Sequence, residues 1–80
     1  MSYRWQYRYG NSLIEVVNET AVQLIVDNEV QDKKEGIRFN VDLNGKLKTG
    51  EQIKASLGGT FKIKCNLFVD NVLQTPILEE

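Results

Sequence analysis

Aromatic and basic side chains alternate at the start of the chain, where four of the seven aromatic residues fall within nine positions. In a strand, the rings would share one face and the arginines the other. The rings are Tyr3, Trp5, Tyr7 and Tyr9, and the arginines are Arg4 and Arg8. An exposed ladder of this kind could stack the bases of single-stranded nucleic acid. We favour the interpretation that the rings pack over the core of a small domain, while pairing of this strand with a second copy of the protein stays open.

A second candidate surface is basic. If the stretches 37–43, 46–57 and 60–69 are neighbouring strands, their outward positions form a lysine-rich sheet face that could meet phosphates. The residues concerned are Arg38, Lys46, Lys48, Lys54, Lys62 and Lys64. Acidic residues dilute this face, and outward lysines also keep a sheet soluble and protect its edges. The second explanation is the one we favour.

Two apolar residues fall at positions that alternation places on the solvent side. Ile25 and Phe68 occupy equivalent places in two similar segments, 24–31 and 67–74, in which five of eight residues are identical. If the two segments lie side by side, these residues form an exposed apolar patch that suits a partner protein or self-association. The alternative is that the N-terminal strand or the C-terminal tail covers these two residues.

Catalytic and metal-binding chemistry finds little support in this sequence. It has no histidine, and its one cysteine, Cys65, alternates with core residues, which predicts an inert buried thiol. Asp27 and Asp70 could share a hard cation across the two similar turns, but Asp at a hairpin turn mostly binds its own backbone. We therefore expect no enzyme, no cofactor and no metal site.

Length and charge narrow the class of protein further. Eighty residues make a single domain, 1–80, and a net charge of −1 gives no overall attraction to nucleic acid or anionic membrane. A lone cysteine excludes an intramolecular disulfide, and no apolar run reaches membrane-spanning length. The N-terminus also lacks a signal-peptide core, so we expect a cytoplasmic location. So small a domain leaves little room for a cavity, and no small-molecule site is evident.

Turn signals recur every 8–12 residues and define the elements that carry these side chains. They predict an all-β fold, a single antiparallel meander forming a β-sandwich or flattened barrel of seven to nine short strands. Asn44-Gly45 carries the strongest hairpin signal. Residues 50–57 read as a strand, with a short helix as the alternative, and 74–80 could form a flexible tail.

Alternation also assigns the core. Over 20–27 it places Val22, Leu24 and Val26 inward, and over 60–69 it places Phe61, Ile63, Cys65, Leu67 and Val69 inward. The remaining inward residues belong to 37–43 and are Ile37, Phe39, Val41 and Leu43. The similarity of 24–31 to 67–74 disappears when the same offset is extended upstream, which favours shared turn chemistry over internal duplication.

Together these patterns predict a non-catalytic binding or assembly module. The expected partner is a protein, quite possibly a second copy, bound through the aromatic strand and the Ile25 and Phe68 patch, with β-augmentation as the simplest mechanism. The alternative is a nucleic-acid-binding β domain that uses the aromatic strand with Arg4, Arg8 and the lysine face. No family motif is present to choose between them.

Overall fold

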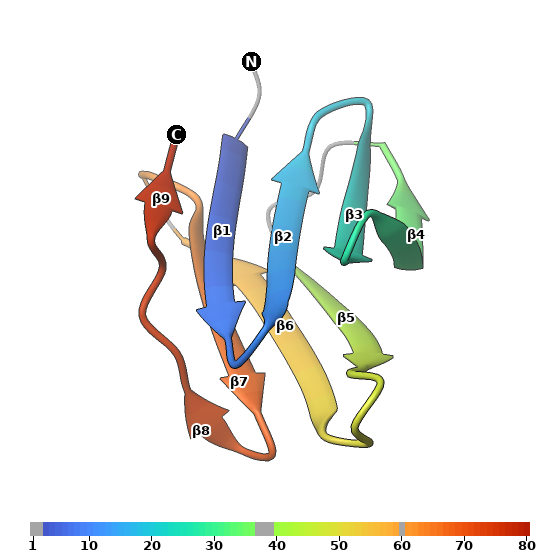
Figure 1. Ribbon diagram of the computed structural model, residues 1–80. Helices are drawn as coiled ribbons and strands as arrows, with labels where there is room; N and C mark the ends of the chain where they lie inside the picture. The colour runs from blue at the N-terminus through green and yellow to red at the C-terminus, as the bar shows by residue number, and fades with distance from the viewer. Residues whose placement is uncertain (1–2, 37–39, 60) are drawn as a thin grey trace.

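Nine β-strands in two antiparallel sheets make up the part of the chain that the structure, a computed structural model, describes: residues 3–36, 40–59 and 61–80 (Figure 1). The strands are β1 (Tyr3–Tyr9), β2 (Ser12–Asn18), β3 (Ala21–Val26), β4 (Glu29–Glu35), β5 (Val41–Lys46), β6 (Gln52–Gly58), β7 (Lys64–Val69), β8 (Val72–Leu73) and β9 (Leu78–Glu79). Sheet A has the order β4-β3-β2-β1-β9, and sheet B has the order β5-β6-β7-β8. The predicted all-β sandwich is confirmed, and the ambiguous 50–57 stretch contributes to strand β6.

The core lies between the two sheets, which form the front and back layers of Figure 1. Sheet A contributes inward residues such as Ile14, Val16 and Leu24, and sheet B contributes Leu43 and Leu67, all with no exposed surface. Strict alternation along each strand brings these side chains together, because successive residues point to opposite faces. The inward positions predicted for 20–27 are confirmed, with Val22, Leu24 and Val26 at most 4% exposed.

The two similar segments form matching hairpins. Asp27 and Asn28 have φ values of 48° and 68°, and Asp70 and Asn71 have values of 48° and 65°. Both central residues of each turn are therefore left-handed, as in the type I′ turns that match the twist of paired strands. Asp and Asn tolerate this conformation better than other non-glycine residues.

Each turn also holds the strand next to its hairpin. The Asp27 backbone N–H donates to the Leu13 carbonyl, and its carboxylate accepts from the Leu13 N–H, both at 2.9 Å. Asp70 makes the same pair of bonds with Gln52, again at 2.9 Å. The repeated aspartates thus fix three strands, in the same way, in each sheet.

The strands β1, β2 and β3 of sheet A correspond in their pairing to β5, β6 and β7 of sheet B. Tyr7 faces Ile14, which faces Val26. In sheet B, Gly45 faces Ile53, which faces Val69. The offset between equivalent residues is 38 for the first strand, 39 for the second and 43 for the third. Longer loops in sheet B cause this drift, so a search at the fixed offset of 43 loses the match upstream.

Asn44-Gly45 does not form the predicted hairpin turn. Both residues lie inside β5, opposite Lys54 and Ile53. A Cβ atom added at Gly45 would meet Leu24 Cδ2 at 3.0 Å and Gln31 Cβ at 3.1 Å. The glycine is therefore explained by the close approach of β5 to sheet A rather than by a turn.

The predicted core position of Phe61 is wrong, since its side chain is fully exposed. The strand begins only at Lys64, so the alternation of β7 does not reach Phe61. Gly59, directly after β6, has a φ of 150°, and a Cβ there would lie 1.9 Å from the Lys62 carbonyl oxygen. Ile63, Leu67 and Val69 are buried as predicted, and Cys65 is partly buried against the core. Ile37 and Phe39 lie outside the described residues.

The two sides of the sandwich are joined in different ways. On one side β4 approaches β5, and the Asn44 N–H donates to the Asp32 carboxylate at 2.9 Å. On the other side the segment 74–80, which the sequence left open as a flexible tail, crosses from sheet B to sheet A. The Ile77 N–H donates to the Gln6 carbonyl at 2.7 Å, and Arg4 and Glu80 exchange two backbone bonds. This crossing frames the candidate site.

Candidate functional site

The N-terminal rings belong to the core. Trp5 is 5% exposed and Tyr7 is 1% exposed, while Tyr3 and Tyr9 pack partly buried against the same cluster. The Tyr3 and Trp5 rings stack with their centroids 5.9 Å apart. These side chains share one face of β1 because they lie two residues apart, and their burial in the core cluster shows that this face points to sheet B. The inward placement that we favoured from the sequence is what the structure shows, and the rings form no exposed ladder.

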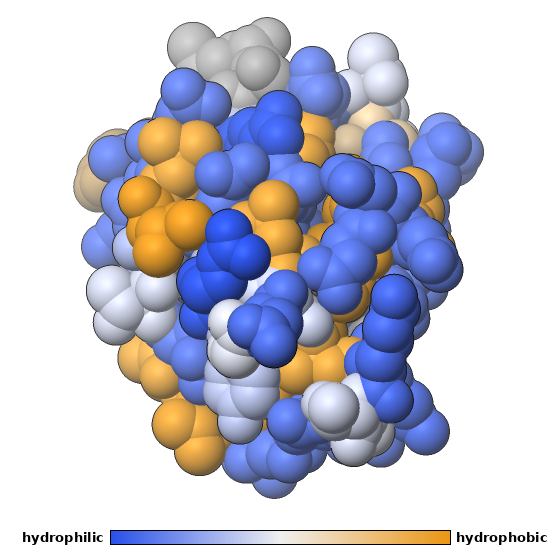
Figure 2. Space-filling model, in the orientation of Figure 1, coloured by the Kyte–Doolittle hydropathy of each residue, from blue (hydrophilic) through white to orange (hydrophobic). Residues whose placement is uncertain are grey.

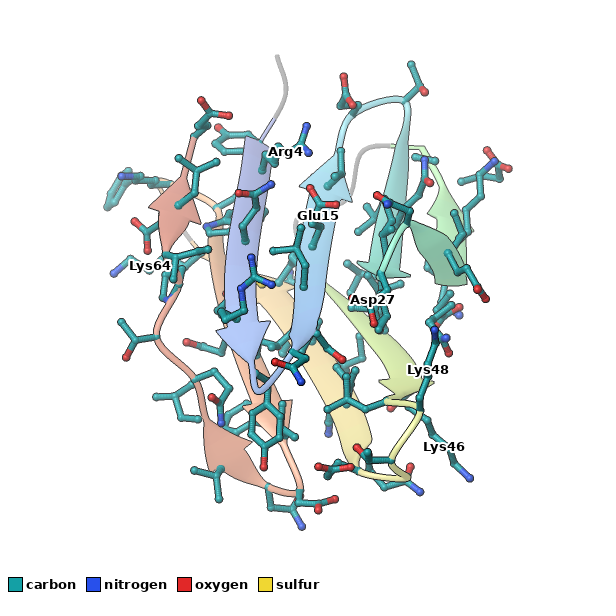
Figure 3. All side chains as sticks on the ribbon, in the orientation of Figure 1. Arg4, Glu15, Asp27, Lys46, Lys48 and Lys64 are labelled. Atoms are coloured by element: carbon teal, nitrogen blue, oxygen red, sulfur yellow. The ribbon has the colours of Figure 1, made fainter. Side chains whose placement is uncertain are left out.

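Arg4 is engaged with an acidic residue of its own sheet. Its guanidinium pairs with the Glu15 carboxylate on the outer face of sheet A, where Figure 3 shows the two side chains on β1 and β2. The Gln6 amide donates to the same carboxylate at 2.8 Å. These hydrogen bonds, Gln6 first, hold the pKa of Glu15 below its usual value despite its burial. Arg8 is exposed on the same face.

Ile25 and Phe68 do not form one patch. Ile25 lies opposite Glu15 on the outer face of sheet A. Phe68 lies opposite Lys54 and Leu73 on the outer face of sheet B. The two matching hairpins belong to different layers of the sandwich (Figure 1), so equivalent outward residues point in opposite directions.

The candidate basic residues are also dispersed. Strands β5, β6 and β7 are neighbours, as the basic-face hypothesis requires. However, Lys54 lies opposite Phe68 and Lys64 lies opposite Gly58. Four residues of strand, about 13 Å, therefore separate the two lysines. Lys46 and Lys48 lie at the β5 end of the sheet (Figure 3), Lys62 is exposed before β7, and Arg38 is outside the described residues.

The most distinctive feature is a strand edge that lacks a neighbour. Strand β8 pairs only with the end of β7, through Phe68 with Leu73 and Val69 with Val72. One further bond runs from the Gln74 N–H to the Leu67 carbonyl at 2.8 Å. The chain then leaves for sheet A. Among the described residues, no backbone bond on this side reaches 63–66, which we call the free edge.

Alternation identifies the backbone groups that the free edge presents. In an antiparallel strand, residues two apart direct their N–H and C=O groups to the same side. The Leu67 carbonyl bonds toward β8, so the N–H and C=O of Cys65 point the same way. Those of Lys64 and Asn66 point toward β6 instead. Cys65 is therefore the residue of β7 whose main chain points to the side where no described strand pairs with β7 beyond Leu67, although its carbonyl also accepts a long bond from the Tyr7 hydroxyl.

A groove of about 360 Å³ lies beside the free edge, between β7 and the C-terminal segment. Its apolar lining includes Trp5, Ile63 and Leu73, and its charged lining consists of Lys62, Lys64 and Glu79. Leu73 is 58% exposed, so the apolar lining continues onto the surface at β8. Figure 2 shows apolar surface gathering at the lower left of the molecule, where β8 lies in Figure 1.

A partly buried thiol and a buried phenol, those of Cys65 and Tyr7, lie beside the groove. Burial raises the pKa of the Cys65 thiol to about 11, and the nearby Glu79 carboxylate acts in the same direction. Burial also raises the pKa of Tyr7, whose hydroxyl makes a long hydrogen bond of 3.5 Å to the Cys65 carbonyl. The thiol is thus protonated at neutral pH, which lowers its reactivity as a nucleophile.

The potential metal ligands of the described part of the chain are scattered. No cluster of three potential ligands among His, Cys, Asp and Glu occurs there. Asp27 and Asp70, which the sequence suggested as a carboxylate pair, each bind a backbone N–H in a different sheet. Over the same residues, no helix has the length and apolar character needed to cross a membrane.

Sequence reasoning did not find the free edge, because an edge depends on which strands are neighbours. The one local signal was Pro76, which has no N–H to donate and sits where the chain leaves sheet B. Comparison with protein-family models, with curated proteins and with solved structures found no match to this chain. The site must therefore be interpreted from its own geometry.

Proposed function

We propose that this protein is a non-catalytic binding module that adds an extended segment of a partner protein to the free edge of β7. In this mode, main-chain hydrogen bonds supply affinity and pockets for alternate side chains supply specificity. The observation that carries the proposal is that the Cys65 main chain faces a groove on a side where no described strand pairs with it. The Cys65 carbonyl accepts only a long bond of 3.5 Å from the Tyr7 hydroxyl there, which leaves one of its two lone pairs for an added strand.

The surroundings of the free edge support this function. Unpaired strand edges are usually blunted by charge, proline or cover, because they attract other chains. The β4 edge follows this rule, with charged residues and an approach to β5. The free edge of β7 also has charged neighbours, Lys62 and Lys64, but it differs from the β4 edge in bordering the apolar lining of the groove, including the indole of Trp5.

Exposed apolar residues at both ends of the groove add to this support. Leu73 and Val72 are 58% and 62% exposed at β8, and Phe61 is fully exposed beyond the other end of the free edge. Lys62 and Lys64 line both the groove and the hollow beside Phe61, so these surfaces are continuous. Apolar anchors of this kind carry much of the energy of protein interfaces.

The proposal can be tested by selecting peptides that bind the protein and asking whether their binding needs the Cys65 N–H. Cys65→Pro removes the N–H that an added strand would use, and spares the β6 ladder because that N–H faces away from β6. Cys65→Ala is the matched control, since it loses the thiol but keeps the N–H. We expect a random-peptide display library to yield sequences that bind the wild type and Cys65→Ala equally and Cys65→Pro at least tenfold more weakly.

A second measurement locates the bound peptide. Hydrogen exchange of the Cys65 amide should slow when a selected peptide binds, because an added strand protects it. Light scattering over a concentration series tests whether a second copy occupies the same edge. Peptides whose affinity is equal for Cys65→Pro and the wild type, or a library that yields no binder, would contradict strand addition.

A further inference from the structure

We infer that the segment bound at the free edge alternates apolar and acidic residues, with the apolar side chains directed into the groove. This inference rests on the proposed function and names the chemistry of its partner. It follows from the different environments that β7 offers on its two faces.

The first step concerns the inward positions of an added strand. A residue placed opposite Cys65 directs its side chain to the same face as Cys65, toward the core side of sheet B. That side of the groove includes Trp5 and Ile63, which are 5% and 3% exposed. A charged side chain there would lose its hydration, and a carboxylate would also meet Glu79. Inward positions therefore favour apolar residues.

The second step concerns the outward positions. A residue opposite Lys64 points to the outer face of sheet B, on the same side as the lysine ammonium. Lys62 and Lys64 are both exposed, and the ion pairs of the described residues include neither of them. Two lysines against the single Glu79 carboxylate leave the lining of the groove with an excess of positive charge, which favours carboxylates in the segment that binds there. Opposite charges across a strand pair stabilise it, and like charges destabilise it.

Three synthetic peptides test this pattern: acetylated and amidated Val-Glu-Val-Glu-Val, Val-Lys-Val-Lys-Val and Val-Ser-Val-Ser-Val. Their binding can be followed by the fluorescence of Trp5, the only tryptophan, which lines the groove. We expect the glutamate peptide to bind about tenfold more tightly than the lysine peptide, with the serine peptide between them, because two rim ion pairs have modest individual effects. The preference should weaken in high salt.

Charge reversal supplies the matched variants. The double change Lys62→Glu and Lys64→Glu should invert the preference toward the lysine peptide. Lys54→Glu makes the same change on the same sheet about 13 Å away, and should leave the preference as it is in the wild type.

The outcomes separate the inference from the proposed function. Equal binding of all three peptides, or preference for lysine, would overturn the acidic pattern while leaving strand addition in place. If none of the three binds, the pattern is wrong, and the library selection described above decides whether strand addition is also wrong. Tighter binding of a twelve-nucleotide oligothymidylate than of the glutamate peptide would overturn the inference in favour of nucleic acid.

Discussion

Replacing Phe61 and Leu67 by alanine, one at a time, tests the boundary between loop and core in sheet B. Simple alternation over 60–69 places both side chains inward, so it predicts a large loss of stability for each. The structure separates them: Phe61 is fully exposed, and Leu67 has no exposed surface. The two replacements should therefore have very different effects on the free energy of unfolding.

The sizes follow from burial. Removing a buried leucine side chain costs about 2–5 kcal/mol, because transfer energy is lost and a cavity remains. Leu67 lies opposite Ala55, a small neighbour that cannot fill the gap, so we expect about 3 kcal/mol or more for Leu67→Ala. That is a large share of the roughly 4–12 kcal/mol typical of a domain of this size. Phe61→Ala should change stability by about 0.5 kcal/mol or less.

Urea denaturation followed by circular dichroism and by Trp5 fluorescence gives both values, provided that the two signals coincide. The Leu67→Ala variant should also melt at least about 10 °C lower, whereas Phe61→Ala should melt within a few degrees of the wild type. A loss above about 2 kcal/mol for Phe61→Ala would refute the exposed loop, because only a buried phenylalanine costs that much. A loss below about 1 kcal/mol for Leu67→Ala would refute the packing of β7.

Three further predictions concern other parts of the fold. Gly45→Val should destabilise by about 1–3 kcal/mol in urea denaturation, because its Cβ would crowd Leu24; equal stability would contradict the close approach. The lowered pKa of Glu15 means that its stabilising effect is complete above its ordinary pKa of about 4.5 and is lost as the pH falls through the lower folded value. Glu15→Gln should therefore show a flatter dependence of stability on acidic pH than the wild type. The Cys65 thiol should react slowly with iodoacetamide at pH 8 and faster toward pH 11, and fast reaction at pH 8 would exclude a buried, protonated thiol.

Local features of the fold were predictable from sequence. The Asp-Asn turns could be predicted, because their left-handed conformation depends only on two residues and on the strands beside them. The inward residues of β3 could also be predicted, because side chains alternate between the two faces along the whole of a continuous strand. The same reasoning failed at Phe61, because the strand that alternation assumes begins only at Lys64.

Features that depend on the third dimension were not predictable. Gly45 resembled a turn residue in the sequence, although a glycine is needed there because β5 lies close to the opposite sheet. Ile25 and Phe68 occupy equivalent positions, and sequence cannot say that two equivalent hairpins face each other across a core. The free edge of β7 could not be predicted either, because it exists only where the chain leaves sheet B after Gln74.

The matching hairpins also have a consequence for how the chain folds. Because both carry the same turn and the same aspartate bonds, the hairpin of one sheet offers a near-native partner to the strand that the aspartate holds in the other sheet, β2 or β6. Proximity along the chain works against this error: only Glu19 and Thr20 separate β2 from β3, so correct pairing closes a short loop, whereas the wrong pairing closes a far longer one. The connection between β6 and β7 is longer. Sheet A therefore has the kinetic advantage, and its early formation would remove the competing hairpin before sheet B assembles.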